Sequence, residues 1–207
     1  MFAVIFEVHP KPEQYAAYLG HAARLRPALE RIEGFLDNER FASELREGWL
    51  VSLSIWRDEA ALIRWRSHGG HRETQLQGRA EVFQDYRLRV GEVVADTAAP
   101  DGTALPPRHL AVAAAGGGRI VTLTEPPANA RPTGPGAGEW FTSITEPGHV
   151  LLLQSWPDAT VATAWLDVQP AAARQRGVRV VRDYGMFDRA EAPHYAPPVS
   201  RLATGTP

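Results

Sequence analysis

Two histidines three residues apart are the strongest candidates for chemistry in this 207-residue sequence. His68 and His71 belong to the stretch WRSHGGHRE, which begins at Trp65, and Gly69 and Gly70 separate them. Histidine titrates near neutral pH, so either ring can act as a general base. The alternative is that both rings are solvated, or simply packed, at the end of a helix. As a metal site the pair is poor, because two ligands are too few and no carboxylate is positioned to complete the set.

A continuous helix would orient the two histidines differently. At about 100° per residue, His68 lies about 60° and His71 about 120° from Trp65, so His68 borders the buried stripe and His71 faces outward. Each glycine between them costs about 1 kcal/mol of helix stability relative to alanine. A bend at the glycines would bring His71 inward. Trp65 can wall a planar pocket and orient an oxygen through its indole N–H, or it can pack as an ordinary core residue.

Four further residues are candidates for contact with a substrate. Arg72 returns to the apolar stripe, about 20° from the tryptophan on an ideal helix, and either snorkels or binds an anion. Tyr86 lies on one face of a predicted strand, where it can contact a ligand or pack as a tyrosine at the edge of the core. Asn38 can hydrogen-bond a ligand from a strand or belong to a turn. Trp56 is the fourth candidate, as an aromatic side chain that can contact the substrate.

The composition excludes several classes of protein. Hydrophobic residues make up 44% and charged residues 22%, and the formal net charge is −2, so nothing indicates a nucleic-acid partner. The absence of cysteine excludes disulfides, thiolate metal sites and cysteine nucleophiles. The opening MFAVIFEVHP is too short for a signal sequence or a membrane span, so we expect a cytoplasmic protein. The sequence has no P-loop, dinucleotide fingerprint, G-x-S-x-G or H-E-x-x-H motif.

The hydrophobic pattern of residues 1–96 predicts the order β-α-β-β-α-β, which is a ferredoxin-like unit. Its first helix should run from Glu13 to Gly34, with a kink or break near Arg26 caused by Pro27. Its second helix should begin at the cap residue Asp58, carry Trp65 on its buried stripe, and end near 78. The strands are expected at 3–8, 35–43, 49–56 and 81–94.

A second copy of this unit follows in the same chain. Four identities recur at an offset of 100 residues, which indicates an internal duplication. They are Gly48/Gly148, Trp56/Trp156, Asp58/Asp158 and Trp65/Trp165. We therefore predict units at 1–96 and 108–192, a linker at 97–107 and an extended tail at 193–207. The second unit is degenerate, because PPANARPTGPGAGE stands in place of its first helix and its second helix is short.

The histidines occur in the first unit alone, since Val168 and Ala171 stand at the matching positions. The first unit is therefore predicted to hold the functional pocket.

The runs SLSIWRDEAALIRWRSHGGHRETQLQGRAEVFQDYRLRVGEVV and RVVRDYGMFDRAEAP resemble small bacterial proteins of the antibiotic biosynthesis monooxygenase superfamily. The resemblance implies an α+β fold, the dimeric α+β barrel, in which two ferredoxin-like units pack sheet to sheet. Here one chain would supply both units, as a monomeric pseudo-dimer or within a homodimer. The resemblance also implies a pocket between the sheet and the helices of each unit. The implied activities are cofactor-independent oxygenation of phenolic polyketides and oxidative heme degradation.

The residues after Trp65 distinguish these two activities. Heme-degrading members carry a ligand histidine ten residues after this tryptophan, where the present sequence has Gln75. Polyketide oxygenases carry a polar aromatic residue six residues after it, where the sequence has His71. The resemblance therefore favours a monooxygenase that oxidises a phenol, quinol or anthrone with O₂ and no cofactor, with His71 favoured over His68 as the base. The alternative is a heme-binding, small-molecule-binding or scaffold protein of the same fold.

Overall fold

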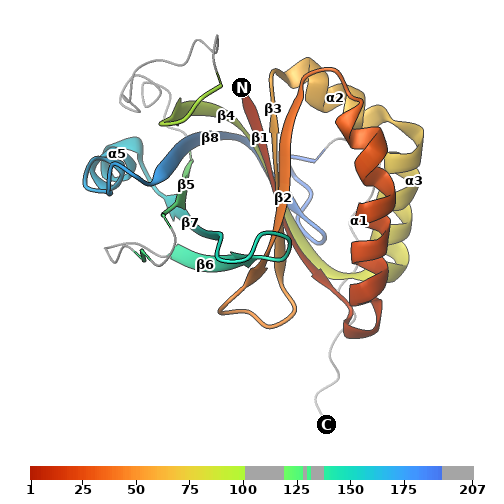
Figure 1. Cartoon of the computed structure of the whole chain (residues 1–207). Helices are drawn as coiled ribbons and strands as arrows, with labels where there is room; N and C mark the ends of the chain where they lie inside the picture. Colours follow the sequence, from red (N-terminus) through yellow and green to blue (C-terminus); the bar gives the residue numbers. More distant parts are fainter. Residues whose placement is uncertain (101–118, 128–129, 132–137, 193–207) are drawn as a thin grey trace.

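The computed structural model describes residues 1–100, 119–127, 130–131 and 138–192. In these parts of the chain eight strands form one closed barrel, in the order β1-β3-β2-β6-β7-β5-β8-β4 (Figure 1). The helices of the first unit pack together on one outer side of the barrel, and α5 lies on the other side. The predicted α+β pseudo-dimer is confirmed.

The two units contribute four strands each. The elements of the first unit are β1 (Phe2–Pro10), η1 (Pro12–Gln14), α1 (Tyr15–Glu30), β2 (Phe35–Ser43), β3 (Leu50–Trp56), α2 (Glu59–Ser67), α3 (Gly69–Gln77), η2 (Gly78–Val82) and β4 (Phe83–Asp96). Those of the second unit are β5 (Ile120–Glu125), β6 (Gly138–Ser143), β7 (Val150–Trp156), α5 (Ala159–Asp167) and β8 (Arg174–Gly185). The observed β2 spans the residues predicted for it.

Equivalent strands of the two units join the barrel. β2 pairs with β6, and β4 pairs with β8 over a longer ladder. The first junction is symmetric about the pair Ala42–Thr142, with Phe41 opposite Ser143 and Ser43 opposite Phe141. These residues extend the sequence repeat at the same offset of 100. The junctions are therefore isologous, as in a twofold-symmetric dimer.

The inner faces of both sheets share one apolar core. Alternate residues of each strand point into the barrel, because successive side chains of a strand lie on opposite faces. The buried members of this core are Ala3, Ile5, Phe41, Val51, Leu53, Ile55, Val93, Val121, Leu123, Phe141, Leu151, Leu153, Val178 and Val180. The sheets thus face each other, as predicted, and are also hydrogen-bonded along both edges into one barrel.

The first helix continues through its proline, so of the kink or break predicted near Arg26 the break does not occur. α1 runs without interruption to Glu30, although Pro27 removes one backbone hydrogen bond. Leu29, two residues beyond the proline, is buried in a cluster with Trp56 and Trp65. We attribute the helical conformation of the last turn of α1 to this packing.

The second helix is broken, contrary to the single helix predicted for residues 58–78. Asp58 caps α2 as expected, with its Oδ1 accepting from the backbone N–H of Ala61 at 2.7 Å. His68 then adopts an extended backbone, with φ −64° and ψ 127°, and separates α2 from α3. The bend therefore occurs one residue before the glycine pair. Angles measured along one ideal helix do not apply across it, and Arg72 is exposed rather than on a buried stripe.

The second unit has the expected short helix, α5, which Asp158 caps through the backbone N–H groups of Thr160 and Val161. No helix occurs between β5 and β6 among the residues described there, and the rest of that segment lies outside them. Most of the predicted linker, 97–107, and the tail, 193–207, also lie outside the described residues.

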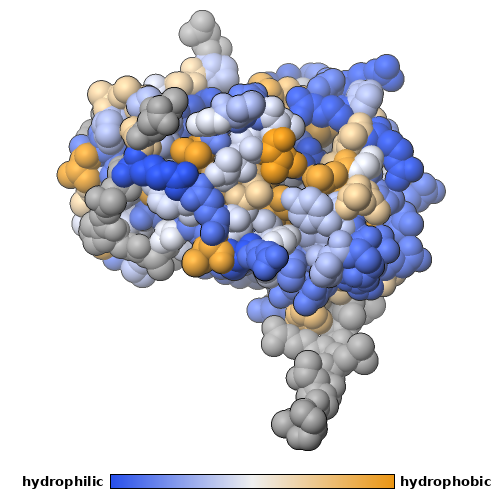
Figure 2. All heavy atoms as spheres, turned by 60° about the horizontal axis from the view of Figure 1, so that its bottom comes forward, coloured by the Kyte–Doolittle hydropathy of each residue, from blue (hydrophilic) through white to orange (hydrophobic). Residues whose placement is uncertain are grey.

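The surface on the side shown in Figure 2 is mostly hydrophilic, with apolar side chains in small groups. Of the helices in the described segments, none combines the length and apolar character needed to cross a lipid bilayer.

An ionic cluster around His149 connects the two units. His149 Nδ1 lies 2.9 Å from Glu39 Oε1, and its Nε2 lies 3.4 Å from Glu125 Oε2. Glu146 is a third carboxylate, at 4.0 Å. The hydrogen bonds to Glu125 and Glu39 raise the pKa of His149 to about 9, against the lowering effect of burial. The imidazolium is therefore the stable form in the folded protein at neutral pH.

We expect this cluster to make stability depend on pH. The folded pKa of about 9 exceeds the ordinary value of 6.5, so the stabilisation is complete below pH 6.5 and is lost as pH rises through 9. The difference between these two pKa values sets an upper limit of about 3.5 kcal/mol, since one pKa unit corresponds to about 1.4 kcal/mol, and solvent screening of this partly exposed group reduces the contribution below that limit. Thermal melts of the wild type and of His149→Gln from pH 6 to 10 measure it. The two melting temperatures should converge at high pH, and a constant gap would contradict the assignment.

Candidate functional site

A cavity of about 240 Å³ lies between the first-unit sheet and its helices. Its floor is the outer face of β1, β3 and β4, where Val4, Phe6, Leu88 and Val90 alternate with the residues of the barrel core. α1, α2 and α3 cover it and contribute apolar side chains such as Leu25 and Leu62. The cavity therefore occupies the place that the resemblance implied.

Trp65, His71 and His68 form a cluster of rings at the break between α2 and α3. His71 stacks on Trp65 with ring centroids 4.4 Å apart and planes 21° apart. His68 stacks on the same indole at 5.6 Å and 26°. Trp65 and His71 line the cavity, whereas His68 is exposed and does not. The break has thus turned His71 inward and His68 outward, the reverse of their orientations on an ideal helix.

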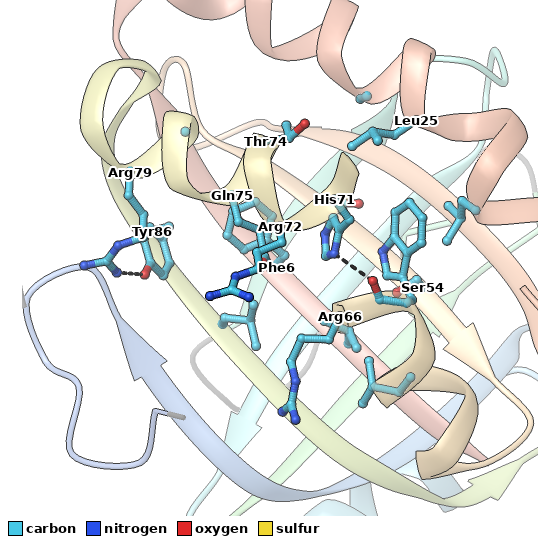
Figure 3. Close-up of a pocket in the computed structure, with 18 of the residues that line it drawn as sticks. Phe6, Leu25, Ser54, Arg66, His71, Arg72, Thr74, Gln75, Arg79 and Tyr86 are labelled. Atoms are coloured by element: carbon cyan, nitrogen blue, oxygen red, sulfur yellow. Dashed lines mark hydrogen bonds between the residues drawn. The ribbon is translucent and has the colours of Figure 1, made fainter. Parts of the chain in front are cut away.

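One hydrogen bond determines which nitrogen of His71 can accept a proton. Its Nδ1 lies 3.1 Å from the carbonyl oxygen of Trp65, which can only accept (Figure 3). In the neutral ring Nδ1 is therefore the donor and Nε2 carries the lone pair. Burial lowers the pKa of His71 to about 4, against the raising effect of this hydrogen bond. His71 is neutral at physiological pH and can act as a proton acceptor.

Tyr86 is held by two arginines. It is buried on β4, lines the cavity and contacts the rings of Phe6 and Phe83. Its hydroxyl oxygen accepts from Nη1 of Arg189 at 2.7 Å and from Nη1 of Arg79. No described residue accepts the hydrogen of this hydroxyl, so it can donate to a substrate oxygen.

The other two predicted contacts have structural partners. Asn38 is buried in β2 and lines the cavity, so of the two alternatives it belongs to the strand and not to a turn. Its Nδ2 donates to Leu53 O at 3.0 Å and its Oδ1 accepts from Arg40. Trp56 is fully buried and lies outside the lining of the cavity, because its side chain points to the core of the first unit. Its indole N–H donates to Ser54, which does line the cavity.

The second unit contributes to this cavity but lacks a comparable one in its described part. Arg182, Tyr184 and Arg189, from β8 and the segment after it, lie in the lining. In the second unit itself, Trp165 packs on Trp156 with centroids 6.0 Å apart, and a nearby cavity encloses only about 10 Å³. The cavity thus lies in the unit predicted to hold it.

Sequence reasoning missed most of the cationic lining. Six arginines and one carboxylate, Glu59, occur among the described lining residues. The arginines are Arg40, Arg66, Arg72, Arg79, Arg182 and Arg189. Those of β8 and beyond reach the site because β8 pairs with β4, a junction that no local pattern indicates. In the sequence, the one indication that this segment belongs to the site was the resemblance of the run RVVRDYGMFDRAEAP to the family.

Comparison with known proteins identifies the family. The family model described as antibiotic biosynthesis monooxygenase matches residues 1–77. A protein of Pyricularia oryzae (strain 70-15) named jasmonate monooxygenase ABM is 37% identical over 97% of this chain and 100% of its own length.

Solved structures include a crystal structure of aldoxime dehydratase, with 11% identity, a TM-score of 0.54, and coverage of 86% of this chain and 80% of that one. A crystal structure of an antibiotic biosynthesis monooxygenase has 22% identity and a TM-score of 0.41, and covers 46% of this chain and 100% of that one. The family model and the Pyricularia relative, which spans nearly the whole chain, agree. The chain belongs to the antibiotic biosynthesis monooxygenase family.

Proposed function

We propose that this protein is a monooxygenase that oxidises a small organic molecule with O₂ in the first-unit cavity, without a cofactor. The observation that carries the proposal is His71, a neutral proton acceptor in an apolar cavity covered by three helices. An electron-rich substrate can, as its anion, pass an electron to O₂ directly. The protein then has to bind the substrate, remove its proton and exclude water.

The proposed reaction balances without an external reductant. His71 Nε2 takes a proton from the acidic C–H or O–H group of the substrate. The anion transfers one electron to O₂, and the substrate radical and superoxide combine into a peroxide. His71 returns its proton to the peroxide, which loses water. A CH₂ group and O₂ thereby become a carbonyl group and one water.

Because the pKa of His71 is lowered, the site has to stabilise the ionised substrate for the proton transfer to occur. A phenol ionises near pH 10, so proton transfer to a histidine with a pKa of about 4 is strongly unfavourable for isolated groups. The ionised substrate beside His71 would raise its pKa, because opposite charges stabilise each other in a low dielectric. Tyr86 can donate a hydrogen bond to the developing oxyanion, and the arginines of the lining lower the energy of that oxyanion further.

Two classes of substrate are candidates. Phenols, quinols and anthrones suit proton abstraction followed by electron transfer to O₂. Jasmonate is the second candidate, because the 37% identical relative is named jasmonate monooxygenase, and for it the steps above balance at the CH₂ group beside the ring ketone.

The dimensions of the cavity support a small substrate over heme. A volume of about 240 Å³ is below the roughly 300–1,000 Å³ of typical ligand pockets. Gln75, at the position of the heme ligand, lines the cavity but has a side-chain amide, a poor ligand for iron. A Soret band in purified protein would favour the heme alternative, and binding without turnover would favour a non-catalytic carrier.

Oxygen uptake tests the proposal. Chelator-treated protein should consume O₂ with the anthrone dithranol or with jasmonate, and ¹⁸O from ¹⁸O₂ should appear in the product. Loss of activity on chelation, with recovery on adding back one metal, would contradict the cofactor-independent mechanism.

The pKa of His71 can be measured directly. Because burial lowers it to about 4, the ring should stay neutral from pH 8 down to about 5. Nitrogen NMR of labelled histidine should therefore show no protonation of His71 over this interval. Assignment of the signal uses the His71→Gln spectrum. A midpoint near the ordinary 6.5 would mean that the ring is solvated, and its role as a buried base would have to be abandoned.

A further inference from the structure

Arginines outside the cavity are paired with carboxylates wherever they are removed from solvent. The half-buried or buried arginines of this kind in the described chain are Arg46, Arg89, Arg174, Arg176 and Arg179. Each forms an ion pair with a glutamate or an aspartate of the protein. This agrees with the high cost of burying an unpaired charge.

Two arginines of the cavity, Arg66 and Arg182, break this pattern. Arg66, Arg72 and Arg182 form no ion pair with a carboxylate of the described chain, and Arg66 and Arg182 are half-buried. Glu59, the one acidic residue among the described lining residues, is exposed and forms no ion pair within them. The positive charges of Arg66, Arg72 and Arg182 therefore have no carboxylate partner among the described residues.

Two of these arginines lie close to His71 in the chain. Arg66 is on α2 and Arg72 is on α3, on either side of the break at His68. Figure 3 shows both side chains extending from the helices that cover the cavity, with His71 on the same helix as Arg72. An anionic group held by them would leave an apolar body in contact with side chains such as Phe6 and Leu88.

We propose that Arg66 and Arg72 bind a carboxylate of the substrate, so that the substrate is an amphipathic organic acid. The guanidinium group suits a planar carboxylate, because it can donate two parallel hydrogen bonds. The carboxylate would fix one end of the molecule at the helices and so select which carbon lies near His71. This inference rests on the proposed function in one respect, that the cavity is the substrate site.

The test uses two probes that differ by one anionic group. They are 8-anilinonaphthalene-1-sulfonate and N-phenyl-1-naphthylamine, which share one aromatic framework, the first with an anionic sulfonate in place of the carboxylate. Fluorescence titrations give both dissociation constants, and jasmonate and methyl jasmonate are then compared as competitors. We expect the wild type to bind each anion at least about tenfold more tightly than its neutral counterpart, as charge-assisted hydrogen bonds do.

The variants locate the effect. Arg66→Gln and Arg72→Gln should each reduce the preference for the anions several-fold and leave the affinity for N-phenyl-1-naphthylamine unchanged. Arg64→Gln is the matched control, since Arg64 is on the same helix, donates to the carbonyl of Glu33 and does not line the cavity. It should retain the wild-type preference.

The proposal is wrong if neither anion binds more tightly than its neutral counterpart, or if Arg64→Gln lowers the preference as much as the other two variants. These measurements need no turnover, so they are independent of the oxygen-uptake assay. Anion preference without oxygenation would reject the proposed function and retain the anion site.

Discussion

The His71→Ala variant should lose at least about 10²-fold in turnover, which is the usual effect of removing a general base. The ring is a neutral, partly buried proton acceptor that lines the cavity. Its removal leaves the indole face of Trp65 without the partner stacked at 4.4 Å, but it breaks no packing within the barrel core. We therefore expect the melting temperature to change by only a few degrees, since side chains at the rim of a core contribute little to stability. Initial rates of O₂ uptake and thermal melts measure the two effects.

His68→Ala is the control, because His68 stacks on the same tryptophan yet lies outside the lining of the cavity. It should keep nearly full activity. Equal losses in the two variants would assign both histidines to the support of Trp65. Full activity of His71→Ala would remove this residue from the mechanism.

Glu7→Ala should destabilise the barrel by about 3–5 kcal/mol, the range for breaking a buried ion pair on one side. Glu7 accepts from Arg89, which is 2% exposed and also donates to Ser155 of the second unit at 2.8 Å. Without the carboxylate, the buried guanidinium keeps the hydroxyl of Ser155 as its one hydrogen-bond partner among the described residues. At about 2–4 °C per kcal/mol for a chain of this size, the melting temperature should fall by roughly 10 °C.

Two further variants test this explanation. Glu33→Ala removes a carboxylate from an exposed pair with Arg57 and should cost at most about 1 kcal/mol. The double variant Glu7→Leu/Arg89→Met removes both buried charges and should be more stable than Glu7→Ala alone. A double variant as unstable as the single one would mean that Glu7 matters for its shape rather than for its charge.

Most of the fold could be predicted because the patterns that specify it are local. The run FLDNERFAS was assigned to a strand at the observed bounds of β2, and the aspartate caps marked the starts of α2 and α5. The repeat indicated two units, each with an apolar sheet face that the other has to cover. Tertiary packing overrode local signals at two places. α1 continued past Pro27 because Leu29 packs on the core, and the helix after Asp58 broke at His68.

The site could be predicted only in part. Trp65, His71 and Tyr86 lie together in one cavity, as expected, and their roles in catalysis stay predictions. Arg189 was not foreseen, since it is 103 residues from Tyr86 and reaches its hydroxyl only after the barrel closes. The sequence also suggested that His71 titrates near neutral pH. Its burial, which lowers the pKa to about 4, is known only from the structure.

The junction of β4 with β8 has a consequence for how the two copies can diverge. In a symmetric homodimer every substitution appears twice, so a change that improves one pocket alters the other in the same way. Joining the copies in one chain removes that constraint. One copy can exchange histidines for Val168 and Ala171 while it contributes Tyr184 and Arg189 to the cavity of the other. The second unit thus forms part of the lining of the first unit's cavity. A chain made of two identical copies of the first unit would lack these lining residues.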